Sequence, residues 1–434
     1  VAGTLGGGVL TNRILELAKR CIRCGFCLEA CPTYRITGAE TASPRGRIRI
    51  MTSVVGEGQP VTDDVLHSLD LCLGCRACET ACPSGVRYGT MVEAFKAYLE
   101  RSGVRKQTQH VSKEALIGLM RDPNAFAASL RLARVSPRLL GGEAMPPPLS
   151  AMLTGKAKAL PIMPHLPSRP SVGSLPPLSV AVGGRRYTVC LLEGCVMRVL
   201  YDRVNRATVR MLQRAGCDVV CPPQLGCCGA LDLHAGFHER GLEVARRFVA
   251  TLGEHEYDYL ISNSAGCGST LREYGELLQD DPVWSARARD LAAKVRDVSE
   301  FLAEIGIPKP TKPFPKVVTY HDACHLAHAQ GVREAPRSLL NMVPGIQMVP
   351  LSESDMCCGS AGIYNMTQPE MARKLLDRKV GNILHTKAEI VAMGNPGCMA
   401  WIDTGLRERG AAVEVLHVME ILDACFEDPL SPTQ

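Results

Sequence analysis

The chain has 434 residues, of which 49 are basic and 44 acidic, with a formal net charge of +5 and an aromatic content of 5%. The charges are dispersed along the chain rather than gathered in a basic block, which argues against nucleic acid as a partner. The length predicts roughly three domains, on the usual allowance of about 150 residues for each.

The 20 cysteines narrow the class of protein further. A disulfide scaffold is typical of short secreted chains, whereas this chain is long and begins without an apolar signal segment. No apolar run approaches the ~20 residues that are required to cross a bilayer, because charged residues interrupt each stretch. We therefore expect reduced, metal-binding thiols in a cytoplasmic protein whose contact with the inner face of the cell membrane is at most peripheral.

The first predicted elements are helices. Leu10, Ile14 and Leu17 share one face of an amphipathic helix over residues 10–20. Ser43 and Pro44 are typical of the N-cap and first residue of a helix that runs to residue 55. These patterns favour an all-helical, ferredoxin-like domain over residues 1–110.

Two identical four-cysteine runs lie within this domain. They are Cys21, Cys24, Cys27 and Cys31, followed by Pro32, and Cys72, Cys75, Cys78 and Cys82, followed by Pro83. The spacing is that of bacterial ferredoxins with two [4Fe-4S] clusters, in which three cysteines bind one cluster and the fourth crosses to the other. The predicted metal ligands are Cys21, Cys24, Cys27 and Cys82 for cluster 1, and Cys72, Cys75, Cys78 and Cys31 for cluster 2. Structural zinc sites favour two pairs of ligands with a longer spacer, and disulfides do not explain two identical runs.

Four other residues accompany these runs. Gly25 and Gly74 allow the backbone to approach a cluster closely. Arg45 and Arg47 either offset the negative charge of a cluster or are solvated arginines in the first turns of a helix, and the sequence leaves both interpretations open.

The remaining chain divides into three parts. Residues 111–180 read as a helical segment followed by a proline-rich linker, which is densest in proline from Pro137 to Pro177. Residues 181–312 and 313–434 each alternate apolar strands with helical patterns, which predicts two α/β domains with parallel sheets. The expected strands are residues 187–192, 218–221, 257–262, 316–320, 347–351 and 389–393. The predicted fold class is therefore a multidomain α+β protein.

These two α/β domains form an internal repeat. Each has a lone cysteine, a Cys-Cys-Gly and a second lone cysteine, and equivalent residues stand 129–131 positions apart. The cysteines are Cys195, Cys227, Cys228 and Cys267 in the first repeat, and Cys324, Cys357, Cys358 and Cys398 in the second. Loops at the carboxyl ends of parallel strands converge, so these thiols are expected to meet. An additional cluster, a redox-active dithiol and a zinc site are all compatible with the pattern.

Some cysteines and histidines have weaker signals. Cys190, Cys217, Cys221 and Cys425 have no counterpart in the repeat, and we expect them to be buried packing residues. The histidines around Cys324, which are His321, His325 and His328, are interpreted first as polar caps of a helix start and second as residues that tune a cluster, carry protons or line a quinone pocket.

With the cysteines placed, the chain resembles the iron-sulfur subunit of bacterial glycolate oxidase over almost its whole length. The stretches that carry the resemblance are CIRCGFCLEACPTYRITG, SPRGRIRI, LDLCLGCRACETACPSGVRYG, LLEGCV, GCCGALDLHAG, SNSAGCGSTLREYG and MCCGSAGIYN. The resemblance implies a separate FAD-bearing subunit that oxidises glycolate or D-lactate, with this chain passing the electrons singly to a quinone pool. The chain itself would then carry no catalytic residue, which agrees with the lack of a dinucleotide fingerprint, a P-loop or a nucleophile elbow.

The repeats, or CCG domains, also resemble those of heterodisulfide reductase, in which the full motif ends in Cys-x-x-Cys. Here Thr270 and Trp401 stand at the last position, so each repeat keeps four thiols. Two other functions remain as alternatives: the iron-sulfur subunit of anaerobic glycerol-3-phosphate dehydrogenase, and a thiol-disulfide enzyme that uses the paired cysteines. An iron-sulfur sensor ranks last, because no DNA-reading element accompanies the motifs.

Overall fold

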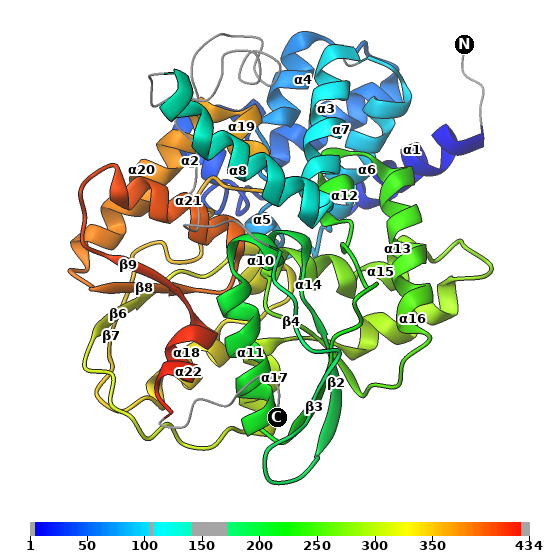
Figure 1. Cartoon of the computed structure of the whole chain (residues 1–434). Helices are drawn as coiled ribbons and strands as arrows, with labels where there is room; N and C mark the ends of the chain where they lie inside the picture. Colours follow the sequence, from blue (N-terminus) through cyan, green and yellow to red (C-terminus); the bar gives the residue numbers. More distant parts are fainter. Residues whose placement is uncertain (1–4, 105–106, 141–171, 427–434) are drawn as a thin grey trace.

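The computed structural model describes residues 5–104, 107–140 and 172–426 (Figure 1). The first of these ranges contains helices and no strand, which confirms the all-helical expectation for the N-terminal domain. Its elements are α1 (Leu5–Ala18), α2 (Pro32–Thr37), the short 3-10 helix η1 (Glu40–Ala42), α3 (Pro44–Glu57), α4 (Asp63–Asp70), α5 (Ala77–Thr80) and α6 (Tyr88–Arg101).

Local sequence signals account for α1 and α3. Leu10 and Ile14 lie on the buried face of α1, with exposed fractions of 7% and 0%. The Ser43 hydroxyl accepts a hydrogen bond from the Gly46 N–H at 3.0 Å, and Pro44 occupies the first turn of α3. The predicted cap and helix start are thus confirmed.

Two further helices, α7 (Gln107–Arg121) and α8 (Pro123–Leu140), follow the N-terminal domain. The predicted linker from Pro137 is wrong over its first four residues, because α8 continues through them to Leu140. The stretch from 141 to 171 lies outside the described residues.

The first repeat contains a five-stranded sheet with the order β1-β3-β2-β4-β5. Its elements are β1 (Leu178–Ser179), β2 (Tyr187–Leu192), α10 (Cys195–Leu200), α11 (Asp202–Arg214), β3 (Cys217–Val220), α12 (Ala230–Ala235), α13 (His238–Leu252), β4 (Tyr259–Ser262), α14 (Ala265–Arg272), α15 (Tyr274–Leu277), α16 (Ser285–Lys294), β5 (Val295–Asp297) and α17 (Val298–Ile305). Strands β2 to β5 are parallel as predicted, whereas the two-residue edge strand β1 pairs antiparallel with β3.

The second repeat contains a four-stranded, fully parallel sheet with the order β7-β6-β8-β9. Its elements are β6 (Val317–Tyr320), the π-helix η2 (His325–Ala329), α18 (Glu334–Asn341), β7 (Gln347–Val349), α19 (Tyr364–Thr367), α20 (Pro369–His385), β8 (Ile390–Met393), α21 (Pro396–Arg407), β9 (Glu414–His417) and α22 (Val418–Ala424). Apart from β1, its strand order is that of the first repeat, so the cysteine repeat is also a repeat of topology.

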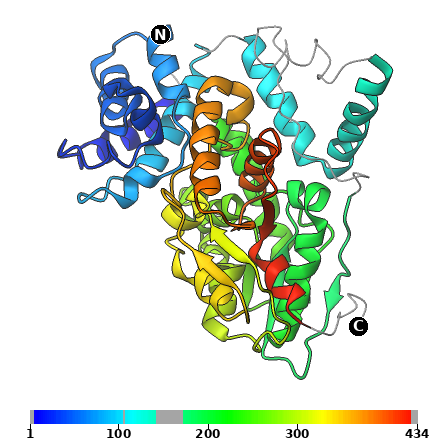
Figure 2. The same cartoon turned by 90° about the vertical axis from the view of Figure 1, so that its left-hand side faces the viewer.

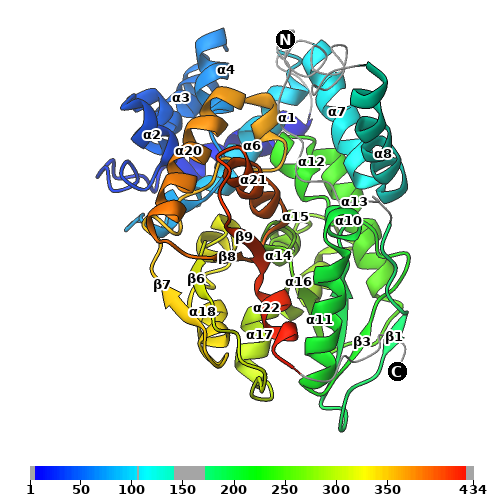
Figure 3. The ribbon, with the colours of Figure 1, turned by 60° about the vertical axis from the view of Figure 1, so that its left-hand side comes forward.

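The repeats share a hydrophobic core and carry the N-terminal domain on top. Val189 and Ile261 of the first sheet belong to the same buried cluster as Val318 and Ile390 of the second. Helices α11 and α22 lie side by side across the boundary (Figure 3). Helix α20, orange in Figure 2, contacts α2 of the N-terminal domain. None of the described helices combines the length and the apolar character needed to cross a bilayer.

Candidate metal centres

The first predicted ligand set surrounds a small cavity at the edge of the N-terminal domain. Cys21, Cys24 and Cys27 line it from the loop between α1 and α2, and Cys82 lines it from the loop after α5. Cys24 is exposed, whereas the other three thiols are partly buried. The structure therefore brings together four residues that the crossing pattern assigns to cluster 1.

The second predicted set surrounds a neighbouring cavity deeper in the protein. Cys72, Cys75 and Cys78 line it together with Cys31, and all four are buried. Although Cys31 belongs to the first run in the sequence, it lies with the second run in space. This placement is what a crossing ligand requires.

The two cavities adjoin each other. Pro44, Cys78 and Tyr88 line both of them, so a single layer of side chains separates the two ligand sets. Cys72 and Leu73 in turn line both the second cavity and a larger central cavity below it. The three cavities therefore form a continuous series from the exposed Cys24 to the interior.

Each ferredoxin loop contains two residues with left-handed backbone, and these occupy equivalent positions. In the first loop they are Arg23 (φ 60°) and Gly25 (φ 91°), and in the second Gly74 (φ 65°) and Arg76 (φ 63°). The sequence predicted this freedom only for the glycines. Left-handed arginines are costly, and the ion pairs of Arg76 with Glu79 and Glu273 hold one of them in place.

Arg47 resolves one of the alternatives that the sequence left open. Its side chain is 1% exposed, and its guanidinium donates hydrogen bonds to the Ser68 carbonyl at 2.7 Å and the Thr33 hydroxyl at 3.0 Å and approaches Cys31 Sγ at 3.9 Å. Among the described residues no carboxylate pairs with it. A buried cation without a carboxylate fits a site that gains negative charge when thiolates bind a cluster.

Arg45, in contrast, behaves largely as a surface arginine. Its side chain is one-third exposed and forms an ion pair with Glu40 at 2.7 Å. It also donates to the Arg23 carbonyl at 3.3 Å, which steadies the first cysteine loop. Of the two arginines, Arg47 therefore fits the charge-compensating interpretation, and Arg45 mainly fits the solvated one.

Tyr88 is a neighbour of the thiols that the sequence did not reveal. It is the first residue of α6 and is 4% exposed. Its hydroxyl lies 3.7 Å from Cys72 Sγ. The backbone N–H groups of Gly74 and Val86 donate to Cys72 Sγ and Cys82 Sγ, both at 3.4 Å. Hydrogen bonds to ligating sulfur are one of the means by which a protein sets a cluster's potential.

Burial disfavours the thiolate forms of two of the cysteines in the second set. Burial raises the pKa of Cys75 well above its ordinary value, with a further increase from Cys324, and burial likewise raises the pKa of Cys78. Cysteine binds metal as the thiolate, so a bound cation must supply the compensating charge. The donor set, the N–H groups and Arg47 therefore fit a [4Fe-4S] cluster.

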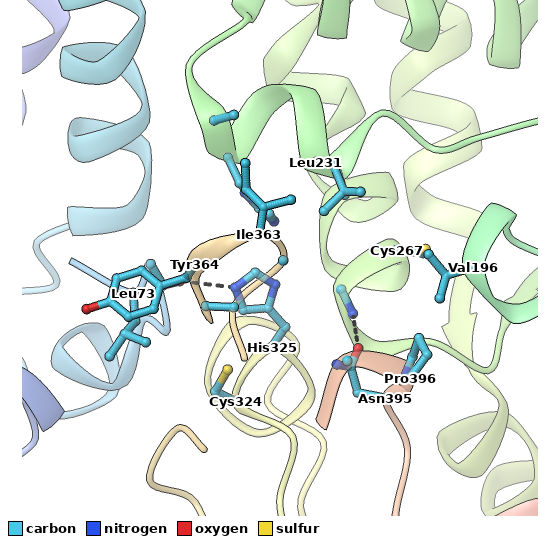
Figure 4. Close-up of a pocket in the computed structure, with 18 of the residues that line it drawn as sticks. Leu73, Val196, Leu231, Cys267, Cys324, His325, Ile363, Tyr364, Asn395 and Pro396 are labelled. Carbon is cyan, nitrogen blue, oxygen red and sulfur yellow. Dashed lines mark hydrogen bonds between the residues drawn. The ribbon is translucent and has the colours of Figure 1, made fainter. Parts of the chain in front are cut away.

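The repeat cysteines converge on the central cavity, which has a volume of about 240 Å³ (Figure 4). All four of the first repeat line it, as do Cys324, Cys357 and Cys398 of the second. The eighth, Cys358, is fully buried and does not line the cavity. Every cysteine follows the carboxyl end of a strand, as the sequence predicted, and the sheets bring the two sets together between the repeats.

Thiols in the first repeat lie in contact with one another. Cys195 Sγ and Cys227 Sγ are 3.7 Å apart, and a hydrogen bond from Cys195, followed by one from Cys228, lowers the pKa of Cys227 well below its ordinary value. A hydrogen bond from Cys228 lowers the pKa of Cys267 as well. Such a group is ready to bind a soft cation or to form a disulfide.

The histidines do not cap a helix, so that interpretation is wrong: no side chain caps η2. His325 instead lines the central cavity, near the centre of the view in Figure 4. It lies within hydrogen-bonding distance of Ser269 (3.0 Å) in the first repeat and the Gly74 carbonyl (3.0 Å) in the second ferredoxin loop. His328 joins Thr80 to the Asp355 carbonyl. These histidines tie the N-terminal domain to both repeats, a role that no local pattern could indicate.

Four cysteines are plain packing residues, as expected: Cys190, Cys217, Cys221 and Cys425 are each at most 1% exposed. They lie in hydrophobic clusters, and none of the four lines any of the three cavities. All 20 cysteines fall within the described residues, and none is paired in a disulfide.

Gly359 is expected to be essential for the turn that presents Cys357 and Cys358. Its φ is +93°, and an added Cβ would lie 2.7 Å from the Ala372 carbonyl oxygen. Gly359→Ala should therefore lower the free energy of unfolding by about 1–3 kcal/mol from backbone strain alone, before the clash is counted. Chemical denaturation followed by circular dichroism would measure this.

The matched control is Gly381→Ala in the middle of α20, where an added Cβ meets no atom within 4 Å. This variant should be unchanged or more stable by up to about 1 kcal/mol, because alanine has the higher helix propensity. Equal destabilisation of both variants would contradict the argument.

Comparison with protein families agrees with this division. A 4Fe-4S dicluster domain matches residues 17–86, and a cysteine-rich domain matches twice, over residues 189–272 and 318–403. The first match spans both ferredoxin runs, and the other two span the repeats. The predicted fold class, a helical ferredoxin-like domain followed by two CCG domains, is thereby confirmed.

Several curated proteins are similar to the chain. A probable glycolate oxidase iron-sulfur subunit of Bacillus subtilis is 36% identical over 416 residues, which cover 93% of this chain and 92% of the relative. The glycolate oxidase iron-sulfur subunit of Escherichia coli is 32% identical, with 95% of each chain covered. Lactate utilization protein A of Exiguobacterium is 33% identical over 236 residues, which are 54% of this chain and 96% of that protein.

A solved structure supports the fold alone. The crystal structure of a hypothetical protein from Helicobacter pylori superimposes with a TM-score of 0.55 and 9% identity, covering 99% of this chain and 74% of that chain. The family follows from the sequence relatives, whose similarity extends over nearly all of both chains. On this evidence the chain belongs to the family of glycolate oxidase iron-sulfur subunits.

Proposed function

We propose that the chain is the electron-transfer subunit of a glycolate or D-lactate dehydrogenase. It receives electrons from an FAD-bearing partner subunit, holds no FAD itself and passes them to a quinone-type acceptor. The observation that carries the proposal is the continuous series of cysteine-lined cavities from the exposed Cys24 to the centre of the molecule. The full-length relatives named as glycolate oxidase subunits support the choice of substrate.

The proposal includes two [4Fe-4S] clusters, whose chemistry when bound is transfer of one electron at a time. Cys21, Cys24, Cys27 and Cys82 hold cluster 1, and Cys72, Cys75, Cys78 and Cys31 hold cluster 2. The eight repeat cysteines hold a further cluster or metal ion, or act as redox thiols. Domain boundaries at residues 110, 180 and 312, and a peripheral contact with the cell membrane, are parts of the same proposal.

The chain's own residues define the path. Arg47 and Tyr88 place a positive charge and a hydroxyl beside Cys31 and Cys72. Pro44 and Cys78 keep the first two sites one side-chain layer apart, and Leu73 separates the second from the central cavity. Short separations favour electron transfer between neighbouring sites. Cluster 1 is the outer end of the path, because its ligand Cys24 is exposed.

The outer end is flanked by two exposed apolar side chains, Ile22 and Phe26, with exposed fractions of 68% and 66%. We expect them to pack against the FAD-bearing subunit. Ile22→Glu combined with Phe26→Glu should weaken association by at least about tenfold, since buried apolar anchors each contribute more than 1 kcal/mol. Affinity for the partner, measured by biolayer interferometry on iron-replete protein, tests this.

The control is Val283→Glu, because Val283 is equally exposed at 65% but lies in the first repeat. This variant should bind the partner as the unmodified chain does. If the double variant bound the partner with normal affinity, the loop around Cys24 would not be part of the interface.

The function itself is tested on the anaerobically purified chain together with its FAD-bearing partner. Iron analysis should give at least about eight irons per chain, because each cube holds four. Addition of glycolate or D-lactate should reduce the clusters, followed by electron paramagnetic resonance, whereas glycerol 3-phosphate should not. If glycerol 3-phosphate reduced the clusters and glycolate and D-lactate did not, the chain would instead be the iron-sulfur subunit of a glycerol-3-phosphate dehydrogenase.

A thiol-disulfide function is the second candidate, and the contact between Cys195 and Cys227 at 3.7 Å favours it. In that case the two thiols would lose two electrons and two protons to the quinone-type acceptor and form a disulfide. Double alanine replacement would then stop electron flow without changing the iron content. If the variant lost bound metal as well as electron flow, these thiols would instead be metal ligands.

A further inference from the structure

One buried side chain in the second repeat has no counterpart in the first. His321 stands three residues before Cys324, and the equivalent position before Cys195 is Leu192. His321 directly follows β6, and Leu192 is the last residue of the equivalent strand β2. The difference is therefore a specific change at one structural position and not a difference in fold.

His321 is completely buried, with an exposed fraction of 0%. Its backbone N–H donates to the Ala392 carbonyl at 2.9 Å, which fixes the residue at the end of β6. The backbone of Ser354 approaches the ring, yet neither Nδ1 nor Nε2 makes a hydrogen bond to any residue that the structure describes. An imidazole with two unsatisfied nitrogens is costly to bury, so the site lacks a partner for it.

The ring points at two thiols. A ring nitrogen of His321 and the Sγ atoms of Cys358 and Cys398 all lie within 4.8 Å of one another, and all three residues are buried. Tetrahedral zinc, with bonds of about 2.0–2.3 Å, holds its nitrogen and sulfur ligands about 3.5–3.8 Å apart. The side chains need to move only slightly to meet that geometry.

The surroundings are suited to thiolates. Asn395 donates a hydrogen bond from Nδ2 to Cys398 Sγ at 3.5 Å. The ammonium group of Lys379, which is 0% exposed, lies close enough to Cys357 and Cys358 to interact with their charge. A buried cation and an amide donor both stabilise ionised sulfur.

We propose that the second repeat binds one divalent cation of the zinc class through His321, Cys358 and Cys398. Cys357, which is adjacent to Cys358 in the chain and whose thiol interacts with that of Cys358, supplies the fourth ligand. An iron-sulfur cube places its thiolates on different iron atoms, whereas these three donor atoms lie within 4.8 Å of one another, close enough to share one ion. With Leu192 in place of the histidine, the first repeat lacks this site. The proposal refines the metal role that the proposed function gives to the repeats and is independent of the ferredoxin clusters.

Metal analysis of the full chain, purified without oxygen and supplied with Zn²⁺, tests the proposal. We expect about one zinc per chain beside the ferredoxin iron. His321→Leu, which copies the first repeat, should weaken zinc binding at least about tenfold and leave the iron content unchanged. His321→Cys restores a ligand and should retain zinc. Replacement of zinc by Co²⁺ should give sulfur-to-cobalt charge-transfer absorption that His321→Leu loses.

His328→Leu is the matched control, because this buried histidine lies in the same segment and contacts Thr80 and Asp355 rather than the thiols. It should keep both zinc and iron. Zinc that survives His321→Leu, or iron found in the second repeat of the unmodified chain in its place, would overturn the site. Loss of glycolate-dependent reduction with zinc intact would instead overturn the proposed function alone.

Discussion

Replacing Cys31 with alanine is expected to remove about half of the iron and to remove it from cluster 2, because each cube holds about four of the eight ferredoxin irons. In the sequence Cys31 closes the first run, but in the structure it lines the cavity of Cys72, Cys75 and Cys78. Iron analysis and electron paramagnetic resonance of the anaerobic protein would show one remaining cluster. Because the central cavity adjoins the lost site, electron transfer beyond cluster 1 should fail as well.

Cys82→Ala is the mirror experiment, since Cys82 closes the second run but lines the cavity of Cys21, Cys24 and Cys27. It should abolish the other signal. Cys425→Ala controls for loss of a buried thiol, because Cys425 is 0% exposed and its Sγ donates only to the Ile421 carbonyl. If Cys31→Ala abolished the signal that Cys82→Ala also abolishes, the crossing assignment would be wrong.

Features fixed by local chemistry could be predicted from the sequence. The strand at 187–192 coincides with β2, and Ser43 and Pro44 begin α3 as expected. Other predicted strands begin or end within two residues of the observed ones. Short apolar runs and helix caps depend on neighbours within a few residues, so a single chain contains the information.

The missed elements are those with weak local signals. Strands β5 and β9 are three and four residues long, and β5 consists of Val295, Arg296 and Asp297, which resemble no apolar strand. Their pairing with β4 and β8 establishes them. Pro137 suggested a linker, but α8 continues through this residue to Leu140.

The candidate site shows the same division. The cysteine spacing predicted the two ferredoxin ligand sets. The equivalent positions of cysteines in the two repeats predicted that the other eight thiols belong to a site. The sequence did not reveal that Tyr88 contacts Cys72, which is 16 residues away along the chain. It placed His321 near Cys324 but not beside Cys358 and Cys398, which are 37 or more residues away. The left-handed Arg23 and Arg76 were also missed, since only glycine signals such a conformation in a sequence.

Charge distribution connects these observations with function. Burial keeps the pKa of Cys75 and Cys78 high in the bare chain, while Arg47 holds a buried positive charge beside the same cavity. Buried thiolates and a buried arginine are each unfavourable alone. When a thiolate-ligated cluster binds, its negative charge interacts favourably with the positive charge of Arg47. The protein is therefore prepared electrostatically for a negatively charged group in the second site more than in the first, where Arg45 is already paired with Glu40.

Arg47→Met is expected to destabilise cluster 2 and to lower its reduction potential. Burial lowers the pKa of Arg47, but attraction to Cys72, Tyr88 and Cys31 outweighs this and raises it above its ordinary value, so the group is a permanent cation. Its removal leaves the cluster charge uncompensated in a buried site, at a cost of about 3–5 kcal/mol. A positive charge nearby favours the reduced cluster, so potentiometric titration of the variant should show a more negative midpoint.

Two companions separate charge from packing. Arg47→Lys keeps the cation but cannot donate to both Ser68 and Thr33 as the guanidinium does, so it should retain most of the potential while losing stability. Arg45→Met removes a one-third exposed, ion-paired arginine and should cost less than about 1 kcal/mol. An unchanged cluster 2 midpoint in Arg47→Met, with the cluster still bound, would show that the buried guanidinium serves packing alone and that hydrogen bonds from Tyr88 and the loop N–H groups set the potential.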